Sequence, residues 1–149
     1  MNYKLQDNIC NCGIYVFINA AAWAGKKITK KKIKEITKSL KYIKGIGVEP
    51  RHLDRVVEKV RGLGFKYTDT YPLPTYDDIK NELKMGNAII FGLDYERMAH
   101  VGLIVKMTKK TVFLVNWGGK NPIKQIRTKT FKRWLNHNLW SIAHVIEKV

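Results

Sequence analysis

The sequence has only two cysteines among its 149 residues, Cys10 and Cys12. A single residue separates them, and a disulfide between such close positions is strained, which excludes a scaffold held together by disulfides. A chain without disulfides is typical of a reducing compartment, and we therefore expect a cytoplasmic location. No secretory signal is recognisable either, because residues 1–11 are polar and precede the first apolar run.

Acidic residues are also scarce. The sequence has 12 Asp and Glu against 28 Lys and Arg, which gives a formal net charge of +16. Many of the lysines lie between Lys26 and Lys44. The simplest interpretation is the solvated face of a helix, and the alternative is a surface that binds nucleic acid or another polyanion. Because Tyr42 is the only aromatic residue of this stretch and no known nucleic-acid-binding motif is present, a polyanion partner is the second of our two hypotheses.

No apolar run is long enough to cross a membrane. The run from Ile14 to Ala24 covers only about half of the roughly 20 residues that a spanning helix needs. Only Asn19 within it is clearly polar, and Gly25 follows it as a residue suited to a helix C-cap. The pattern therefore predicts a helix that is buried on most faces, with Cys12 at or near its first turn.

The sequence also lacks the patterns that hold metals and phosphate groups. The two cysteines and the scattered histidines do not have a recognised spacing for the four ligands of a zinc site. The glycine-containing stretch at residues 45–48 is not followed by the Lys-Ser or Lys-Thr of a phosphate-binding loop. We therefore expect no metal, no organic cofactor and no insertion into a membrane.

Helical patterns come first along the chain and strand patterns come later, which is the order of an α+β domain. Because no linker, repeat or low-complexity segment interrupts residues 1–149, we expect a single domain with N-terminal helices packed on a C-terminal antiparallel sheet. Helices are predicted at residues 12–24, 30–40, 50–61, 76–84 and 129–136. Strands are predicted at residues 65–68, 88–93, 100–107, 111–115, 123–126 and 140–146.

Local signals add detail to this outline. Helix N-caps are expected at three threonines, Thr29, Thr75 and Thr128. Pro72 and Pro74 predict a connection rather than a strand over residues 70–74. Residues 94–98 are polar and are expected to form a hairpin loop that overhangs a cleft.

Cys12 has the setting of a nucleophilic cysteine. At the head of a helix, unpaired backbone N–H groups and the positive end of the helix dipole favour the thiolate, which is the reactive form. Cys10 is the competing nucleophile, but it lies in the loop before the helix and lacks a following glycine, whereas Gly13 follows Cys12. The structural alternative for Cys12 is a small buried hydrophobic residue.

A thiolate needs a base, and the base needs a group that orients it. His100 begins one predicted strand and Asn116 ends the next, so a tight turn between antiparallel strands brings both side chains to the same end of the sheet. Asn116 is expected to accept a hydrogen bond from one imidazole nitrogen and to leave the other facing the sulfur of Cys12. Gln6 is expected to offer its side-chain amide beside the Cys12 backbone N–H, as an oxyanion hole.

In this chain order, Gln6, Cys12, His100 and Asn116 resemble the catalytic set of the papain-like cysteine peptidases. The short chain resembles more narrowly the bacteriocin-processing peptidases, which are double-glycine leader peptidase domains often fused to ABC exporters. The shared features include a Gln-(five residues)-Cys-Gly opening and an apolar helix that ends in glycine, and they cover nearly the whole chain. The resemblance implies a papain-like fold and peptidase activity.

Positions 116 and 117 can be compared directly with these two families. The bacteriocin-processing family usually carries Asp where this chain has Asn116. In papain-like peptidases, a tryptophan shortly after the Asn covers the Asn–His hydrogen bond, and the resemblance gives this place to Trp117.

The first hypothesis is therefore a cysteine peptidase that acts on a peptide or protein substrate, with the roles assigned above. The same residues serve isopeptidases, deamidases and transpeptidases, and the sequence does not choose between them. The second hypothesis is a basic module, catalytically inactive or with a second role, that binds nucleic acid or another polyanion through the lysines between Lys26 and Lys44.

Overall fold

The computed structural model of the protein describes residues 2–7, 12–40, 60–96 and 98–149. Nearly all of the predicted helix over residues 50–61 lies outside these ranges, as do Cys10 and the last lysines of the stretch that ends at Lys44.

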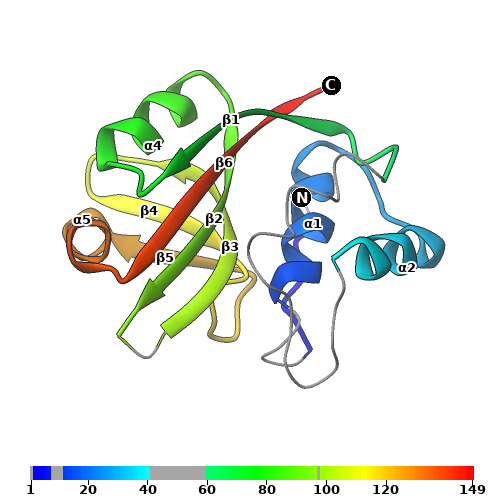
Figure 1. Ribbon diagram of the computed structural model, residues 1–149, viewed down its shortest axis with the longest axis horizontal. Helices are drawn as coiled ribbons and strands as arrows, with labels where there is room; N and C mark the ends of the chain where they lie inside the picture. The colour runs from blue at the N-terminus through cyan, green and yellow to red at the C-terminus, as the bar shows by residue number, and fades with distance from the viewer. Residues whose placement is uncertain (1, 8–11, 41–59, 97) are drawn as a thin grey trace.

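One antiparallel sheet forms the centre of the described structure (Figure 1). Its strands are β1 (Phe65–Pro72), β2 (Ala88–Tyr95), β3 (Met98–Met107), β4 (Thr111–Val115), β5 (Ile123–Arg127) and β6 (Trp140–Lys148). They lie in the order β1-β6-β2-β3-β4-β5, so the last strand of the chain is inserted between the first two. All five pairings are antiparallel.

Helices cover both faces of this sheet. They are α1 (Cys12–Trp23), α2 (Lys30–Ser39), α4 (Tyr76–Lys84) and α5 (Thr128–His137). Figure 1 shows α1 and α2 on one side of the sheet and α4 and α5 on the other. The predicted α+β class, with N-terminal helices packed on an antiparallel sheet, is confirmed. None of the helices among the described residues is long and apolar enough to cross a membrane.

The two faces of the sheet belong to two separate clusters of buried side chains. The first cluster joins α1 and α2 to the sheet, and it contains Phe17 of α1 together with Val101 and Val115 of the sheet. The second cluster lies on the side of α4 and α5 and contains Phe91 and Phe131. Neighbouring residues of a strand point to opposite faces, and in β3 Val101 and Leu103 accordingly belong to the first cluster and Ile104 to the second.

The helix termini follow the local signals of the sequence. Gly25 has a φ of 81°, and hydrogen bonds from the Gly25 and Lys26 N–H groups to the Ala22 and Ala21 carbonyls close α1 in a Schellman motif. Caps by Thr29 and Thr75 are confirmed, and Thr75 with Asp78 forms a complete capping box.

Three local predictions are wrong. The strand β1 continues to Pro72, which pairs with Ile142, because an edge strand tolerates a residue that has no N–H to donate. A hairpin lies at residues 94–98 as expected, but the predicted limits of its loop are wrong, since β2 runs to Tyr95, which pairs with Met98. Thr128 does not cap α5 but is its first residue, and its hydroxyl is buried without a hydrogen-bond partner.

Candidate active site

The candidate site lies where β3 begins and β4 ends. Antiparallel pairing of these strands, with Leu103 opposite Val115, places His100 near the residue that follows β4, which is Asn116. The N-terminal segment is fixed beside them by two hydrogen bonds between Lys4 and Asn19 of α1, Lys4 N to Asn19 Oδ1 at 2.7 Å and Asn19 Nδ2 to the Lys4 carbonyl at 2.9 Å. Two further hydrogen bonds, between Gln6 and Asn116, hold the same segment beside the end of β4.

The imidazole of His100 is held by the backbone of Asn116. Its Nε2 lies 2.5 Å from the Asn116 carbonyl oxygen. A carbonyl oxygen can only accept, so Nε2 carries the hydrogen and Nδ1 of the neutral ring keeps its lone pair. The ring is thus fixed in the tautomer that can accept a proton at Nδ1.

The side chain of Asn116 faces Gln6 instead of His100. Asn116 Oδ1 accepts from the Gln6 backbone N–H at 2.9 Å, and Asn116 Nδ2 donates to Gln6 Oε1 at 2.8 Å. The backbone N–H can only donate, which fixes the orientation of the Asn116 amide and, through it, that of the Gln6 amide. The expected contact between the Asn116 side chain and the imidazole is therefore replaced by one from its backbone carbonyl.

The conformation of Asn116 explains this exchange. Its φ is 58°, a left-handed conformation that asparagine adopts more readily than most residues, and its N–H donates to the Pro122 carbonyl at 2.8 Å. The residue is only 1% exposed. A buried left-handed turn presents the carbonyl in one direction and the side chain in another, so one residue contacts both His100 and Gln6.

Trp117 packs against the histidine. The two rings meet edge to face with centroids 4.8 Å apart, and Trp117 also stacks on Phe91 and Trp134. Trp117 can lie so close to the sheet because residue 102 is glycine: a Cβ there would be 2.5 Å from the indole. Sequence reasoning missed Gly102, although a glycine inside a strand is a known signal of close approach.

Burial sets the protonation of His100. Desolvation of the half-buried ring lowers its pKa from the ordinary value of 6.5, and the hydrogen bond to the Asn116 carbonyl opposes this effect in part. The neutral form therefore predominates near pH 7. A neutral imidazole with a free lone pair is the form that a general base requires.

Cys12 is the first residue of α1 and is partly buried. It packs against the first cluster, which contains Val101 and Val115, the sequence neighbours of His100 and Asn116. His100 itself pairs with Leu93 of the second cluster, so its side chain lies on the opposite face of β3. The structure thus links Gln6, Asn116 and His100 by hydrogen bonds and places the helix that begins with Cys12 against the other face of the same strands.

No group of three or more His, Cys, Asp or Glu side chains in the described part of the chain is arranged to hold a metal ion. Polar contacts at the candidate site are instead made by amides, a carbonyl and an imidazole. This set suits proton transfer and the binding of a developing negative charge.

No model of a known protein family matches the sequence, and no curated protein matches it. Solved structures do match its fold. The peptidase domain of Streptococcus ComA, a bifunctional ABC transporter involved in a quorum-sensing pathway, superimposes with a TM-score of 0.66 at 14% identity, over 97% of this chain and 98% of that one. A putative C39-like peptidase from Bacillus anthracis superimposes with a TM-score of 0.65 at 11% identity, over 99% and 96% of the two chains. The chain therefore has the fold of these peptidase domains, and the likeness to papain-like, bacteriocin-processing peptidases inferred from its sequence is confirmed as a likeness of fold.

Proposed function

We propose that the protein is a cysteine peptidase with Cys12 as nucleophile and His100 as general base and acid. The observation that carries the proposal is the hydrogen-bonded chain from Gln6 through Asn116 to His100 in a peptidase fold. A chance arrangement of these residues has no reason to fix both the tautomer of His100 and the orientation of the Gln6 amide, so the arrangement supports a catalytic role.

Asn116 has two roles in this proposal. Its carbonyl holds the imidazole with Nδ1 available, and its side chain holds Gln6 by the carbonyl end of the amide. The NH₂ end of Gln6 then points away from Asn116, and its proposed role is that of an oxyanion donor together with the backbone N–H of Cys12. One such donor typically contributes about 3 kcal/mol to transition-state stabilisation.

The reaction follows from these positions. The Cys12 sulfur forms a bond to the substrate carbonyl carbon while its proton passes to Nδ1 of His100. The carbon–nitrogen bond then breaks, and His100 returns the proton to the leaving amine. Water next attacks the thioester with His100 as base, which releases the acid product and restores the thiol. The nucleophile must remain a free thiol, so we expect the enzyme to act in a reducing compartment.

For this reaction, the Cys12 sulfur must come close to Nδ1 of His100. Cys12 packs with the face of the sheet that contacts α1, whereas the His100 ring starts from the opposite face, so the thiol has to meet Nδ1 around the beginning of β3. His100 is the third residue of that strand and is only half-buried, which leaves the ring near the strand end. Direct chemistry on the thiol tests this point best.

The experiment is alkylation by iodoacetamide at pH 7, followed over time by peptide mapping. Cys10 provides an internal reference, since it lies two residues away in the same chain. We expect Cys12 to react at least about tenfold faster than Cys10, and His100→Ala to bring the two rates together, because an activated thiolate depends on its imidazole. Equal rates for both cysteines in the unaltered protein would contradict the proposal.

Substrate class is tested separately, with a mixture of peptides from a digested bacterial proteome and mass spectrometry of the products. The resemblance of the sequence to double-glycine leader peptidases makes peptides with small residues before the cleaved bond the first candidates. The unaltered protein and Cys10→Ala should cut the same peptides, and Cys12→Ala should cut none. Cleavage that survives Cys12→Ala would assign the activity to another residue or to a contaminant.

A further inference from the structure

A second feature of the molecule is a strongly basic surface on the side of α4 and α5. A groove of about 950 Å³ lies between the β4 and α5 regions, and its basic lining residues are Lys109, Lys110, Arg127, Lys129, Lys132 and Arg133. A neighbouring groove of about 680 Å³ shares Lys109 and Lys132 with it and adds Lys80, Lys84 and Lys106. We call these nine residues the basic tract. No Asp or Glu lines either groove.

The charges of the basic tract are not neutralised within the part of the chain that the structure describes. The ion pairs there are Lys32 with Glu35 and Lys66 with Glu147, neither of which involves the basic tract. Lys132 instead lies over the ring of Tyr76 at 4.4 Å, which leaves its charge available to an anion. Concentrating so many like charges disfavours the folded state unless a partner compensates them.

The N-terminus of α5 adds to the positive potential of the larger groove. Its first residues, Thr128 to Thr130, line the groove, and its first turn contains no acidic residue. Unpaired N–H groups and the helix dipole make a helix N-terminus favourable for anions. The N-terminus of α5 and the basic side chains therefore both increase the positive potential of the larger groove.

We propose that the basic tract binds the phosphate backbone of a nucleic acid. The two grooves adjoin through Lys109 and Lys132, so they form one extended surface that suits a chain of phosphates better than a single phosphate ion. Their concave shape suits a rod or a strand better than the flat surface of a bilayer. Lysine and arginine dominate the lining of the two grooves, and Tyr76 is the one Phe, Tyr or Trp among the lining residues. This composition favours contacts to phosphates over the reading of bases, so binding depends little on sequence.

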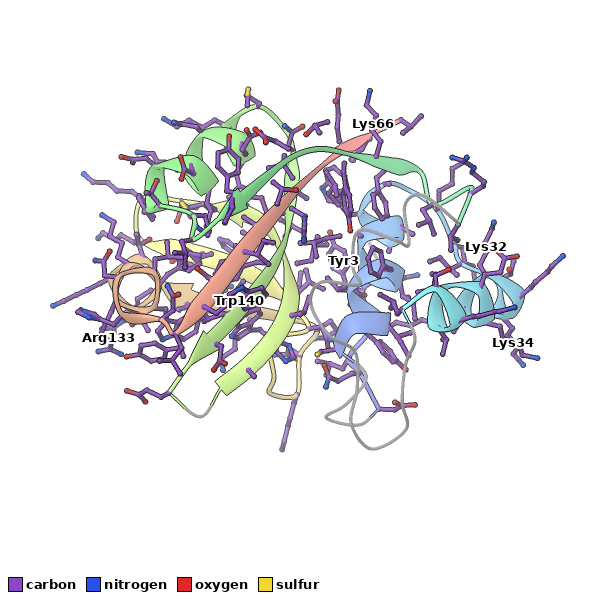
Figure 2. The ribbon with its side chains drawn as sticks, viewed as in Figure 1. Tyr3, Lys32, Lys34, Lys66, Arg133 and Trp140 are labelled. Atoms are coloured by element: carbon purple, nitrogen blue, oxygen red, sulfur yellow. The ribbon has the colours of Figure 1, made fainter. Side chains whose placement is uncertain are left out.

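This surface differs from the lysine stretch between Lys26 and Lys44. Figure 2 shows Lys32 and Lys34 on α2 at one side of the molecule and Arg133 near α5 at the other, with the sheet between them. The basic tract also lies on the far side of the sheet from α1. The residues that line the two grooves do not include Gln6, Cys12, His100 or Asn116, so the proposal is independent of the peptidase proposal.

The test is fluorescence anisotropy with a 20-base-pair DNA duplex of arbitrary sequence, titrated at several salt concentrations between about 50 and 200 mM. The test variant is Lys109→Gln with Lys132→Gln, since these lysines belong to both grooves. The matched control is Lys31→Gln with Lys34→Gln on α2, which lowers the net charge equally. Each lost phosphate contact should reduce the slope of log K against log salt by about one.

We expect the slope to fall by about two in the test variant and to stay unchanged in the control. Equal losses in both variants would overturn the proposal, because binding would then follow net charge alone. A larger fall of the slope in the control variant would show that nucleic acid binds through the lysines of α2 instead. Binding of polyglutamate as tight as that of DNA, with the same dependence on Lys109 and Lys132, would replace the proposed partner with an acidic protein.

Discussion

The roles given to Asn116 lead to an unusual prediction for its replacement by aspartate. In Asn116→Asp, one carboxylate oxygen still accepts from the Gln6 backbone N–H, but the other has no hydrogen for Gln6 Oε1. The Gln6 amide can relieve this repulsion by turning over and donating its NH₂ group to the carboxylate. The number of hydrogen bonds is kept, but a carboxylate is buried at a position that is only 1% exposed, so we expect the free energy of unfolding to fall by about 1–2 kcal/mol.

Catalysis should respond much more strongly than stability. Once the Gln6 NH₂ group is bound to the new carboxylate, it no longer serves the oxyanion, and loss of one such donor costs about 10²–10³ in kcat. Asn116→Ala differs, since it removes both hydrogen bonds and leaves a partly buried N–H of Gln6 without a partner. It should lower the free energy of unfolding by about 2–3 kcal/mol.

Urea unfolding followed by tryptophan fluorescence gives the stabilities, and cleavage of a peptide found by the library assay gives kcat. The decisive control is the double-mutant cycle with Gln6→Ala, because Asn116→Asp should have no further effect on kcat when Gln6 is absent. If Asn116→Asp preserves or raises kcat, the side chain at position 116 acts on the imidazole and our assignment of its role is wrong.

Three further predictions concern His100, Gly102 and Thr75. Burial lowers the pKa of His100 in the folded protein below the ordinary value of 6.5. The neutral ring therefore contributes fully to stability above pH 6.5, and this contribution is lost as the pH falls through the pKa of the folded state. Urea unfolding across pH 5–8 should show this loss, and His100→Gln should abolish it. Gly102→Ala should lower the free energy of unfolding by about 1–3 kcal/mol, because its Cβ would lie 2.5 Å from the indole of Trp117. In the control Gly92→Ala, the new Cβ would lie 3.1 Å or more from its neighbours, so the free energy of unfolding should fall by less in the same assay. Thr75→Ala removes the capping box of α4 and should cost about 1 kcal/mol in thermal unfolding, and an unchanged melting temperature would show that the cap contributes nothing.

Helix boundaries were predictable because their signals are local. The Schellman closure at Gly25 and the caps at Thr29 and Thr75 depend on residues within one turn of the helix end. The Thr128 cap failed for a tertiary reason. The N–H of Thr128 donates to the Lys110 carbonyl across the sheet edge, and this contact starts the helix one residue early.

Strand limits depended on neighbours that the sequence does not reveal. A proline such as Pro72 excludes a strand only where the strand would have partners on both sides. The strand β1 has one partner, β6, which is about 70 residues away along the chain. The short hairpin between β2 and β3 likewise reflects pairing of Asp94 with Ala99, which extends both strands past their apolar residues. Polarity alone could not distinguish this exposed hairpin end from a loop.

Chain order and spacing identified the candidate site residues but not the atoms that meet. A His and an Asn at adjacent strand ends could be placed together by antiparallel pairing, which the structure confirms for the two residues. The left-handed φ of Asn116 depends on its hydrogen bond to Pro122 and on the packing of Trp117, and neither is visible in a one-dimensional pattern. That single dihedral determines that the carbonyl meets His100 and the amide meets Gln6.

The two proposals concern opposite ends of β3, and this separation has a physical consequence. The hydrogen-bonded chain through Asn116 depends on the start of β3 and the end of β4, whereas the basic tract includes Lys106 near the far end of β3 and Lys109 just beyond it. Lys106 is six residues from His100, which corresponds to about 20 Å along the strand. That distance exceeds the screening length of roughly 8 Å at physiological salt, so replacing Lys109, which lies beyond Lys106, should leave the pKa of His100 unchanged. A shift in the pH profile of Lys109→Gln would mean that the two ends of the strand are coupled.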